Sequence, residues 1–365
     1  MTMQEMKFSV IMSIYQNDVP EHLHIALESL LNQTRRPDEI VIVGDGPVPA
    51  ELEQEIERLP TDLHRFTQKT ETQAPSNSRP PTNSPEEAPS NSPERGWKAD
   101  ANEKCKVQGS KLHTDSTELT DSITQTSRSL PLGGAEGGFN SQSSILNLQG
   151  HETVIRYLPQ EKNRGLGAAL AIAVEAAHYP YLARMDADDI AVPDRFEKQL
   201  RFLEQHPDVA AVGGMIEDFS SDPNHVTGRR IVPLESEDIH RYMRSRNGMN
   251  HVTVMFKKEE LLRVGNYQPF HLNEDYYLWV RMIQQGCQLM NIPDVLVRVR
   301  AEKEQVDRRG GFPYFRDQYR VFKYMLNTGF ISWPRFLLNI CERGTVQLLM
   351  PLSVRCWFYQ RFLRK

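Results

Sequence analysis

The chain has 365 residues, of which 39% are hydrophobic and 25% are charged, so it has the composition of an ordinary globular protein with one large or two smaller domains. Its formal net charge of −5 argues against a nucleic-acid partner, and its four widely spaced cysteines argue against structural zinc or a disulfide-stabilised fold. The sequence shows no secretory signal and no apolar run of transmembrane length, so we expect a cytoplasmic protein.

Residues 1–66 show the alternation of strands and helices that is typical of an α/β protein. The apolar run FSVIMSI (8–14) has strand length, and five apolar residues between Leu23 and Leu31 recur at helical spacing. The apolar run EIVIVG (39–44) predicts a second buried strand, which ends directly before Asp45. Two buried strands joined through a helix predict the first unit of a parallel sheet.

Residues 67–150 differ in composition from the sequence on either side. They are rich in Ser, Thr, Pro and Asn, and their only aromatic residues are Trp97 and Phe139. Such a segment buries too little apolar surface to offset the entropy of ordering, so we predict a disordered insertion. Because the entropy of loop closure grows only slowly with length, residues 1–66 and 151–312 can form one domain across it.

After the insertion the alternation of strands and helices resumes. TVIRY (153–157), YLARM (181–185) and VAAVGGMI (209–216) are predicted strands. Apolar residues recur at helical spacing from 166 to 177 and again in a helix that opens at Pro193. The whole pattern predicts a Rossmann-like α/β fold, in which helices flank a mostly parallel sheet and ligands bind beyond the carboxyl ends of the strands.

Acidic residues follow one of these strands at the edge where ligands are expected. Asp186, Asp188 and Asp189 come directly after YLARM (181–185), and carboxylates this close together repel one another. Hard divalent cations prefer such oxygen ligands, and Mg²⁺ usually shares its site with substrate phosphates. The structural alternative is a solvated acidic turn that precedes the next helix.

Two further motifs open predicted helices. NRGLGAA (163–169) contains small residues that would let the helix N-terminus approach a ligand closely. Glu274 and Asp275 open an apolar helix, where one carboxylate can act as a general base that is poised by the other. The structural alternatives are a simple helix start for the first motif and an interaction with the helix dipole for the second.

The order of these motifs resembles that of family 2 glycosyltransferases of the GT-A fold. The resemblance covers residues 7–66 and about 151–330, and it rests on SVIMSIYQND, NQTRRPDEIVIVGDG, NRGLGAAL, ARMDADDIAVPDRFEKQLRFLE and NEDYYLWVRM. NGMNHVTVMFKK and RRGGFPYF are similar to a subgroup of bacterial enzymes that build capsular and extracellular polysaccharides, of the amylovoran-biosynthesis type. The insertion at 67–150 is a departure from the family pattern.

The resemblance implies a site for a nucleotide-sugar donor at the carboxyl edge of the sheet. The residues that it assigns to the nucleotide are Ser13, Tyr15, Asp45, Asn163, Gly165 and Asp186, with Asp45 on the base. It assigns Asp186, Asp188 and Asp189 to a Mn²⁺ or Mg²⁺ ion on the donor diphosphate. A UDP-sugar is the expected donor, because the family commonly uses uridine.

The resemblance also implies the reaction. Asp275, with Glu274 beside it, matches the base that takes a proton from the acceptor hydroxyl, and the sugar is transferred with inversion at the anomeric carbon. The acceptor would be a glycan or a polyprenyl-diphosphate-linked sugar. Two alternatives stay open: a sugar-phosphate nucleotidyltransferase, in which Glu274 and Asp275 have no obvious task, and a catalytically inactive nucleotide-sugar-binding protein.

The region after the last expected strand departs from the family. Many relatives have a histidine here that helps to hold the metal or the diphosphate, and VLVRVRAEKEQVDRRGGF contains none. Arg300, Arg308 and Arg309 are candidate diphosphate contacts, with ordinary surface arginines as the alternative. Asn250 and His251 are candidate acceptor contacts, with a structural histidine as the alternative.

Residues 313–365 are basic and amphipathic. Nine Lys and Arg residues and two acidic residues give this segment a net charge of +7, and large apolar residues lie between them. Helices of this kind can lie on an anionic membrane, which would place the protein at the inner face of the cytoplasmic membrane beside a lipid-linked acceptor. The alternative is a helical hairpin that packs on the catalytic domain and exposes its cationic side.

Overall fold

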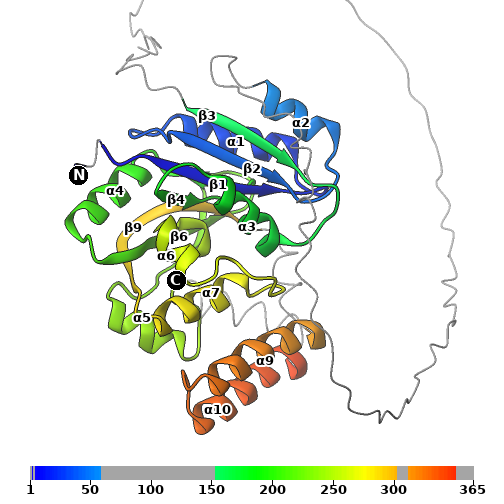
Figure 1. The fold of residues 1–365 in the computed structure, drawn as a ribbon. Helices are drawn as coiled ribbons and strands as arrows, with labels where there is room; N and C mark the ends of the chain where they lie inside the picture. Colours follow the sequence, from blue (N-terminus) through cyan, green and yellow to red (C-terminus); the bar gives the residue numbers. More distant parts are fainter. Residues whose placement is uncertain (1, 3–4, 59–152, 302–310, 351–365) are drawn as a thin grey trace, which may run out of the picture. The chain divides into compact units, whose positions relative to one another are not determined.

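The computed structural model describes residue 2 and residues 5–58, 153–301 and 311–350, which are coloured in Figure 1. The insertion predicted at 67–150 lies outside the described residues, as does the end of the basic segment after residue 350. Within the described ranges, no helix is long and apolar enough to cross a membrane.

One nine-stranded sheet forms the centre of the fold (Figure 1). In chain order its strands are β1 (Phe8–Ile14), β2 (Glu39–Gly44), β3 (Val154–Pro159), β4 (Tyr181–Arg184), β5 (Ile190–Ala191), β6 (Val209–Phe219), β7 (Val226–Arg230), β8 (Met255–Lys257) and β9 (Gln288–Arg300). Their order in space is β3-β2-β1-β4-β8-β6-β9-β5, and β7 pairs with β6.

The strand directions confirm the mostly parallel sheet that the sequence predicts. β3, β2, β1 and β4 are parallel neighbours. Because β8 is antiparallel to both β4 and β6, and β6 is parallel to β9, the strands β6 and β9 run in the same direction as β1. The carboxyl ends of six strands therefore point to the same side of the sheet. The predicted strands are all present, and β6 extends three residues beyond the predicted 209–216.

Helices cover both faces of the sheet. The helices on one face are α1 (Pro20–Leu31), α2 (Ala50–Glu57) and α4 (Arg195–Gln205). Those on the other face are α3 (Leu166–Ala176), α5 (Ser236–Met243), α6 (Lys258–Arg263) and α7 (Glu274–Gln284). Side chains of β2 alternate between the two cores, since Ile40 and Ile42 face the first set of helices and Val41 and Val43 face the second.

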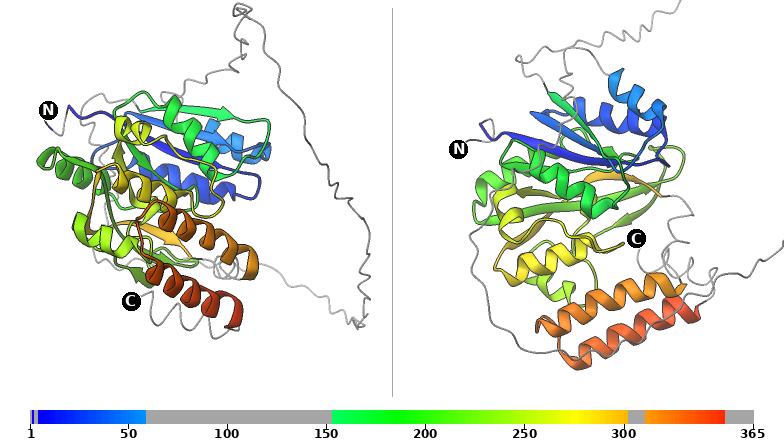
Figure 2. Two further views of the ribbon diagram at one scale, coloured as in Figure 1. Left: turned by 60° about the horizontal axis from the view of Figure 1, so that its bottom comes forward. Right: turned by 45° about the vertical axis from the view of Figure 1, so that its right-hand side comes forward.

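Two antiparallel helices, α9 (Gly311–Asn327) and α10 (Trp333–Gly344), follow the sheet and lie side by side in Figure 2. Val321, Phe322 and Met325 of α9 and Phe336 of α10 are buried in the same core as α7. The first part of the predicted basic segment is therefore helical and packs on the α/β sheet domain. A short π-helical turn, η3 (Thr345–Leu349), follows α10.

Candidate active site

Three carboxylates lie together where β4 ends at the carboxyl edge of the sheet. Oxygen atoms of Asp186, Asp188 and Asp189 lie within 4.8 Å of one another. The last three residues of β4 are buried, so the chain leaves the core directly into this acidic cluster. Carboxylate oxygens are the ligands that Mg²⁺ and Mn²⁺ prefer.

Two arginines flank the acidic cluster. Arg184, the last residue of β4, is buried and donates to Asp186 through both of its terminal nitrogens, at 2.6 Å for Nη1. Arg300, the last residue of β9, donates its backbone N–H to Asp189 at 2.9 Å and its Nε–H to the backbone carbonyl of Asp188 at 3.3 Å. The structure thus places one of the three candidate diphosphate arginines beside the cluster.

Burial and mutual repulsion still dominate the protonation of the cluster. Burial and the neighbouring Asp186 raise the pKa of Asp188 to about 6, although Arg184 and Arg300 act in the opposite direction. Burial, Asp186 and Asp188 raise the pKa of Asp189 well above its usual range. A divalent cation would remove this penalty. The donor set therefore fits the ion that the family resemblance implies.

A fourth carboxylate, Asp18, lies in the same region, and the sequence motifs assign it no role. It follows β1, and its Oδ2 accepts the backbone N–H of Tyr15 at 2.9 Å. Burial, together with Asp188 and Asp186, raises the pKa of Asp18 to about 7 against the effect of the Tyr15 N–H. The available signal was its position four residues after a strand that ends at the same edge.

Asp45 connects the end of β2 to the start of α3. Its two carboxylate oxygens accept the backbone N–H groups of Arg164 at 2.7 Å and Gly165 at 2.9 Å. Gly46 lies against Asn163, because a Cβ at Gly46 would come within 2.7 Å of the Asn163 backbone nitrogen. Three of the predicted nucleotide-binding residues are thus brought together, and the Asp45 carboxylate shapes the turn that carries the other two.

The remaining nucleotide-binding and diphosphate candidates are placed as follows. Ser13 is the second-last residue of β1 and Tyr15 is the first residue after the strand, and both are half-buried at its carboxyl end. Arg308 and Arg309 lie outside the described residues.

The second acidic pair begins α7. Asp275, the second residue of the helix, accepts an amide N–H from Asn247 at 2.6 Å through Oδ2 and the backbone N–H of Tyr276 at 2.6 Å through Oδ1. The Asn247 side chain is itself held, because its Oδ1 accepts the backbone N–H of Met249 at 3.1 Å. Asn247 opens the NGMNH segment, and its contact with Asp275 was not apparent from the sequence, since 28 positions separate them.

The pKa values of this pair are raised. Burial raises the pKa of Asp275, although the hydrogen bonds that it accepts and nearby arginines act in the opposite direction. Burial and Asp275 raise the pKa of Glu274 to about 7, and Asp186 adds to this effect. Because Asp186 acts on Glu274, the acidic cluster and the acidic pair lie within electrostatic range of each other. A carboxylate with a pKa nearer neutrality is a better proton acceptor than an ordinary one.

A close approach between α3 and α7 joins the two parts of the site. Gly167 lies in the first turn of α3, and a Cβ at this position would come within 3.0 Å of the carbonyl oxygen of Gln268 and 3.2 Å of Glu274 Cβ. A glycine therefore lets the start of α3 lie against the start of α7. The packing brings the NRGLG motif next to the Glu274-Asp275 pair.

The two candidate acceptor residues take part in internal hydrogen bonds. Asn250 is buried, and its Nδ2 donates to the backbone carbonyl of Gly214 at 2.7 Å. The Nε2 atom of His251 lies 2.8 Å from the hydroxyl of Tyr267, and its ring packs edge-on against Trp279. Burial lowers the pKa of His251 well below its usual range, with a smaller contribution from Arg184. These contacts favour the structural alternative for both residues.

Sequence comparison identifies relatives that span the whole chain. The model of the family described as Glycosyl transferase family 2 matches residues 140–265. An uncharacterized glycosyltransferase of Haemophilus influenzae is 31% identical over 99% of this chain and 100% of its own. The amylovoran biosynthesis glycosyltransferase AmsE of Erwinia amylovora is 30% identical over 97% of this chain and 98% of its own. A UDP-Gal:alpha-D-GlcNAc-diphosphoundecaprenol beta-1,3-galactosyltransferase of Escherichia coli is 28% identical over 98% and 97%.

Structure comparison agrees with the sequence. The crystal structure of S. aureus TarS 1-349 in complex with UDP-GlcNAc matches with a TM-score of 0.53 at 12% identity, covering 93% of this chain and 73% of that one. This likeness concerns the fold, and it supports the GT-A fold that the motifs predicted. With relatives at 30% identity or more along nearly its full length, the chain belongs to glycosyltransferase family 2 and is a glycosyltransferase.

Proposed function

We propose that this glycosyltransferase moves a sugar from a UDP-sugar to a hydroxyl of a lipid-diphosphate-linked sugar or glycan, with inversion, in bacterial polysaccharide biosynthesis. Two relatives support this substrate class by their names, which refer to amylovoran biosynthesis and to a UDP-galactose donor with a diphosphoundecaprenol-linked acceptor. Both relatives match this chain over nearly their whole length. The proposal includes a catalytic domain made of residues 1–66 and 151–312.

The observation that carries the proposal is the pairing of two unlike acidic groups at one edge of the sheet. The cluster of Asp186, Asp188 and Asp189 lies between two guanidinium groups. Asp275 lies within electrostatic range of Arg184, which flanks the cluster, and is held by a neutral amide. Transfer from a nucleotide diphosphate needs these two environments, one for the leaving diphosphate and one for the proton of the acceptor hydroxyl.

On the donor side, Asp186, Asp188 and Asp189 would hold a Mn²⁺ or Mg²⁺ ion. When bound, such an ion supplies positive charge that stabilises the departing diphosphate. The guanidinium of Arg300 lies beside the same carboxylates and adds a fixed positive charge. We assign the nucleotide to the neighbouring turn formed by Asp45, Asn163 and Gly165, with Ser13 and Tyr15 at the end of β1.

On the acceptor side, Asp275 would take the proton from the acceptor hydroxyl. The Asn247 amide fixes the direction of its carboxylate, and burial raises its pKa toward the range that suits a base. Glu274, the neighbouring acid, raises the proton affinity of the pair through repulsion. A single displacement needs no protein nucleophile, which is consistent with inversion.

We further propose that the enzyme works at the inner face of the cytoplasmic membrane. α9, α10 and η3 carry exposed apolar side chains next to exposed arginines. The exposed apolar side chains of this region include Phe312, Trp333, Leu337, Leu338, Leu348 and Leu349. Surfaces of this composition bind anionic membranes.

Replacing Asp275 with Asn tests the central assignment. Removal of the base while the shape is kept is expected to lower kcat by about 10²- to 10⁴-fold, with unchanged Kd for the donor nucleotide. Initial rates with a UDP-sugar and calorimetric titration of UDP with and without Mn²⁺ measure the two effects. Asp294→Asn, at a part-exposed aspartate that pairs with Lys198, serves as the matched control. Unchanged turnover in Asp275→Asn would exclude Asp275 as the base.

A further inference from the structure

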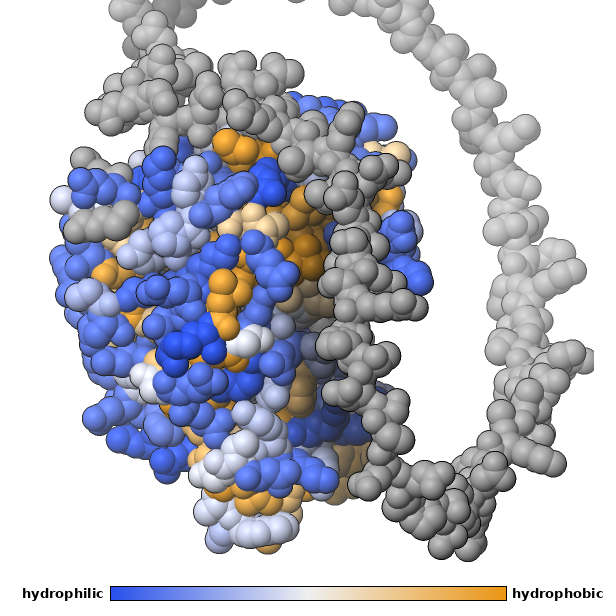
Figure 3. All heavy atoms as spheres, in the orientation of Figure 1, coloured by the Kyte–Doolittle hydropathy of each residue, from blue (hydrophilic) through white to orange (hydrophobic). Residues whose placement is uncertain are grey.

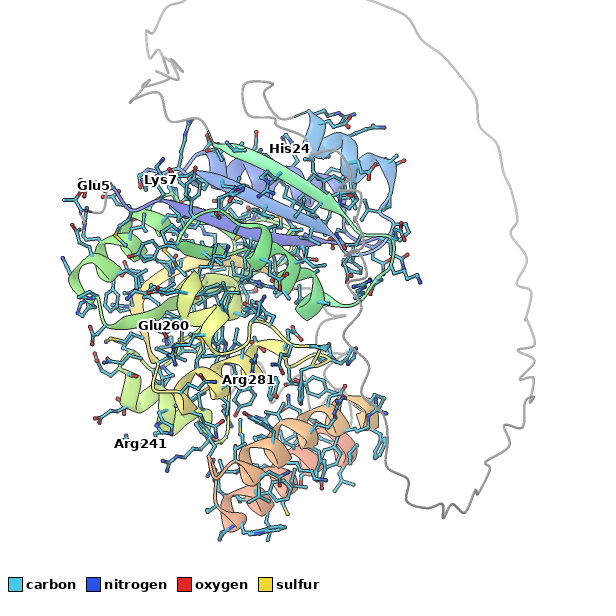
Figure 4. The ribbon with its side chains drawn as sticks, in the orientation of Figure 1. Glu5, Lys7, His24, Arg241, Glu260 and Arg281 are labelled. Atoms are coloured by element: carbon cyan, nitrogen blue, oxygen red, sulfur yellow. The ribbon has the colours of Figure 1, made fainter. Side chains whose placement is uncertain are left out.

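A cavity lies outside the site described above. It has a volume of about 930 Å³ and lies between α5, the residues that follow α5, and the turn that connects α9 to α10. Among its lining residues are three arginines, Arg241, Arg244 and Arg335, and we call it the arginine cleft. Figure 4 shows Arg241 on α5, on the side of the sheet where α9 and α10 lie.

The arginine cleft has an excess of positive charge. Arg241 pairs with the lining residue Asp238 at 2.8 Å. Across the described ranges, neither Arg244 nor Arg335 forms an ion pair with an acid, and the Nε atom of Arg335 is buried without a hydrogen-bond partner. Burial and the charge of Arg244 lower the pKa of the neighbouring His240. A buried guanidinium N–H without a partner is costly, and an anion would satisfy it.

The wall of the arginine cleft is continuous with the support of the proposed base. The carbonyl oxygen of Met243 accepts a hydrogen bond from the Tyr276 hydroxyl at 2.6 Å, and Tyr276 follows Asp275. Asn339 of α10 donates to the carbonyl of Arg244 at 2.8 Å. The same segment reaches Asn247, whose amide holds Asp275. Residues 243–247 therefore face the cleft at one end and the proposed base at the other.

The cleft also adjoins exposed apolar surface. Arg335 of α10 lines the cleft, and Leu338, three residues later on the same face of the helix, is 47% exposed. Figure 3 shows hydrophobic atoms among hydrophilic ones over the region of α9 and α10. An anionic group that enters the cleft next to this surface would be attached to a lipid.

We propose that the arginine cleft binds the diphosphate group of a lipid-linked acceptor. This inference rests on the proposed acceptor class and adds the place where the acceptor is held. Arg244 and Arg335 would form charge-assisted hydrogen bonds with the diphosphate oxygens, while the apolar side chains of α10 contact the lipid. The sugar attached to the diphosphate would then reach over residues 243–247 toward Asp275.

Vesicle binding tests the proposal without relying on turnover. The full chain is mixed with phosphatidylcholine vesicles that contain a small fraction of undecaprenyl diphosphate, or with vesicles of equal negative charge that contain phosphatidylglycerol. EDTA is present so that no cation can link the diphosphate to the acidic cluster. We expect binding to the diphosphate vesicles to be tighter by about tenfold or more, since a single charge-assisted hydrogen bond contributes about a factor of ten. Inorganic pyrophosphate is expected to compete.

The double variant Arg244→Gln/Arg335→Gln is expected to lose this preference and to bind both kinds of vesicle equally. The matched control is Arg58→Gln/Arg201→Gln, which removes the same charge from exposed arginines outside the cleft and outside α9 and α10 and should keep the preference. Melting temperatures of both variants verify that the fold is intact. Equal binding of the two vesicle types by the unmodified chain, or equal loss in both double variants, would overturn the proposal. Neither result depends on Asp275, so a failure here is distinct from a failure of the proposed reaction.

Discussion

Asp186, Asp188 and Asp189 lie between two guanidinium groups, whereas Asp275 accepts hydrogen bonds from a neutral amide and from the backbone of its own helix. The first group is at the end of a buried strand, and the second is at the start of a helix. Burial raises the pKa values in both groups, so proton affinity alone does not separate them. Their arrangement does: three adjoining carboxylates can share one cation, whereas a single carboxylate that neutral donors hold in one direction can accept a proton.

The two groups also differ in what supports them. The acidic cluster is held by strands β4 and β9, which are part of the sheet. The acidic pair depends on loops, since Asn247 lies between α5 and η2 (His251–Thr253), and Gln318 of α9 donates to the side chain of Asn273 at 2.5 Å just before Glu274. The donor side therefore has the more rigid scaffold. The acceptor side can vary with the loops and with the helices that follow the sheet.

Replacing Asp188 with Asn tests whether the acidic cluster binds the ion. Loss of one anionic ligand from the cluster is expected to lower kcat about a thousandfold, as several kcal/mol of charge stabilisation disappear. Titration with UDP should show binding that no longer depends on Mn²⁺. The conservative control is Asp222→Asn, an aspartate of an exposed turn. Binding that still requires Mn²⁺ would show that Asp188 is not a ligand.

Replacing Asn247 with Ala tests whether the amide of Asn247 sets the pKa of Asp275. The Asn247 amide donates to the charged form of Asp275 and so lowers its pKa; without it the pKa rises. Since only the unprotonated carboxylate accepts a proton, the acidic limb of the pH profile of kcat/KM should move upward by about one pH unit. Glu274, Arg230 and Arg184 face the same carboxylate and are unchanged in this variant.

At pH values on the acidic limb, we therefore expect kcat/KM of Asn247→Ala to be about tenfold lower than that of the unmodified enzyme. At higher pH the loss should be smaller. Asn224→Ala, in an exposed turn, should leave the profile where it is. A uniform loss at every pH would instead indicate that Asn247 contributes only to the stability of the loop.

Much of the fold follows from local patterns in the sequence. The runs of β1, β2 and β4 are mostly apolar, because helices cover the sheet on both faces and successive side chains enter one core or the other. Such runs are easy to recognise in a sequence. The acidic cluster was also predictable, since its three members are adjacent in the chain and follow a strand. Each motif alone is a weak signal, and it is their order along the chain that identifies the fold.

Contacts between distant segments were not predictable. Asn247 meets Asp275 across 28 positions, and Asp18 meets Asp188 only because β1 and β4 are neighbours in the sheet. The family resemblance assigns Asp45 to the nucleotide base, and the structure shows in addition that its oxygens hold the start of α3. Its nucleotide contact stays a prediction. Periodicity reports which face of an element is buried, but it does not report which polar groups meet.

Gly167→Ala should have the smallest effect, and it tests the place where the two halves of the site touch. The start of α3 is held by Asp45, and the start of α7 carries Glu274. An added Cβ would come within 3.0 Å of the Gln268 carbonyl, so the two helices must move apart at a cost of about 1–3 kcal/mol. A gain in helix propensity of up to about 1 kcal/mol opposes this.

We therefore expect a lower melting temperature in Gly167→Ala and a loss of a few fold in kcat. Gly344→Ala is the matched control, because its Cβ would lie 3.7 Å from Phe315, an ordinary contact, and should leave stability equal or improved. Thermal unfolding and initial rates distinguish two interpretations of the contact between α3 and α7. Lower stability with full turnover would mean that the donor and acceptor sides tolerate a shift between them. Loss of turnover beyond the loss of stability would mean that the spacing between α3 and α7 sets the distance across which the sugar is transferred.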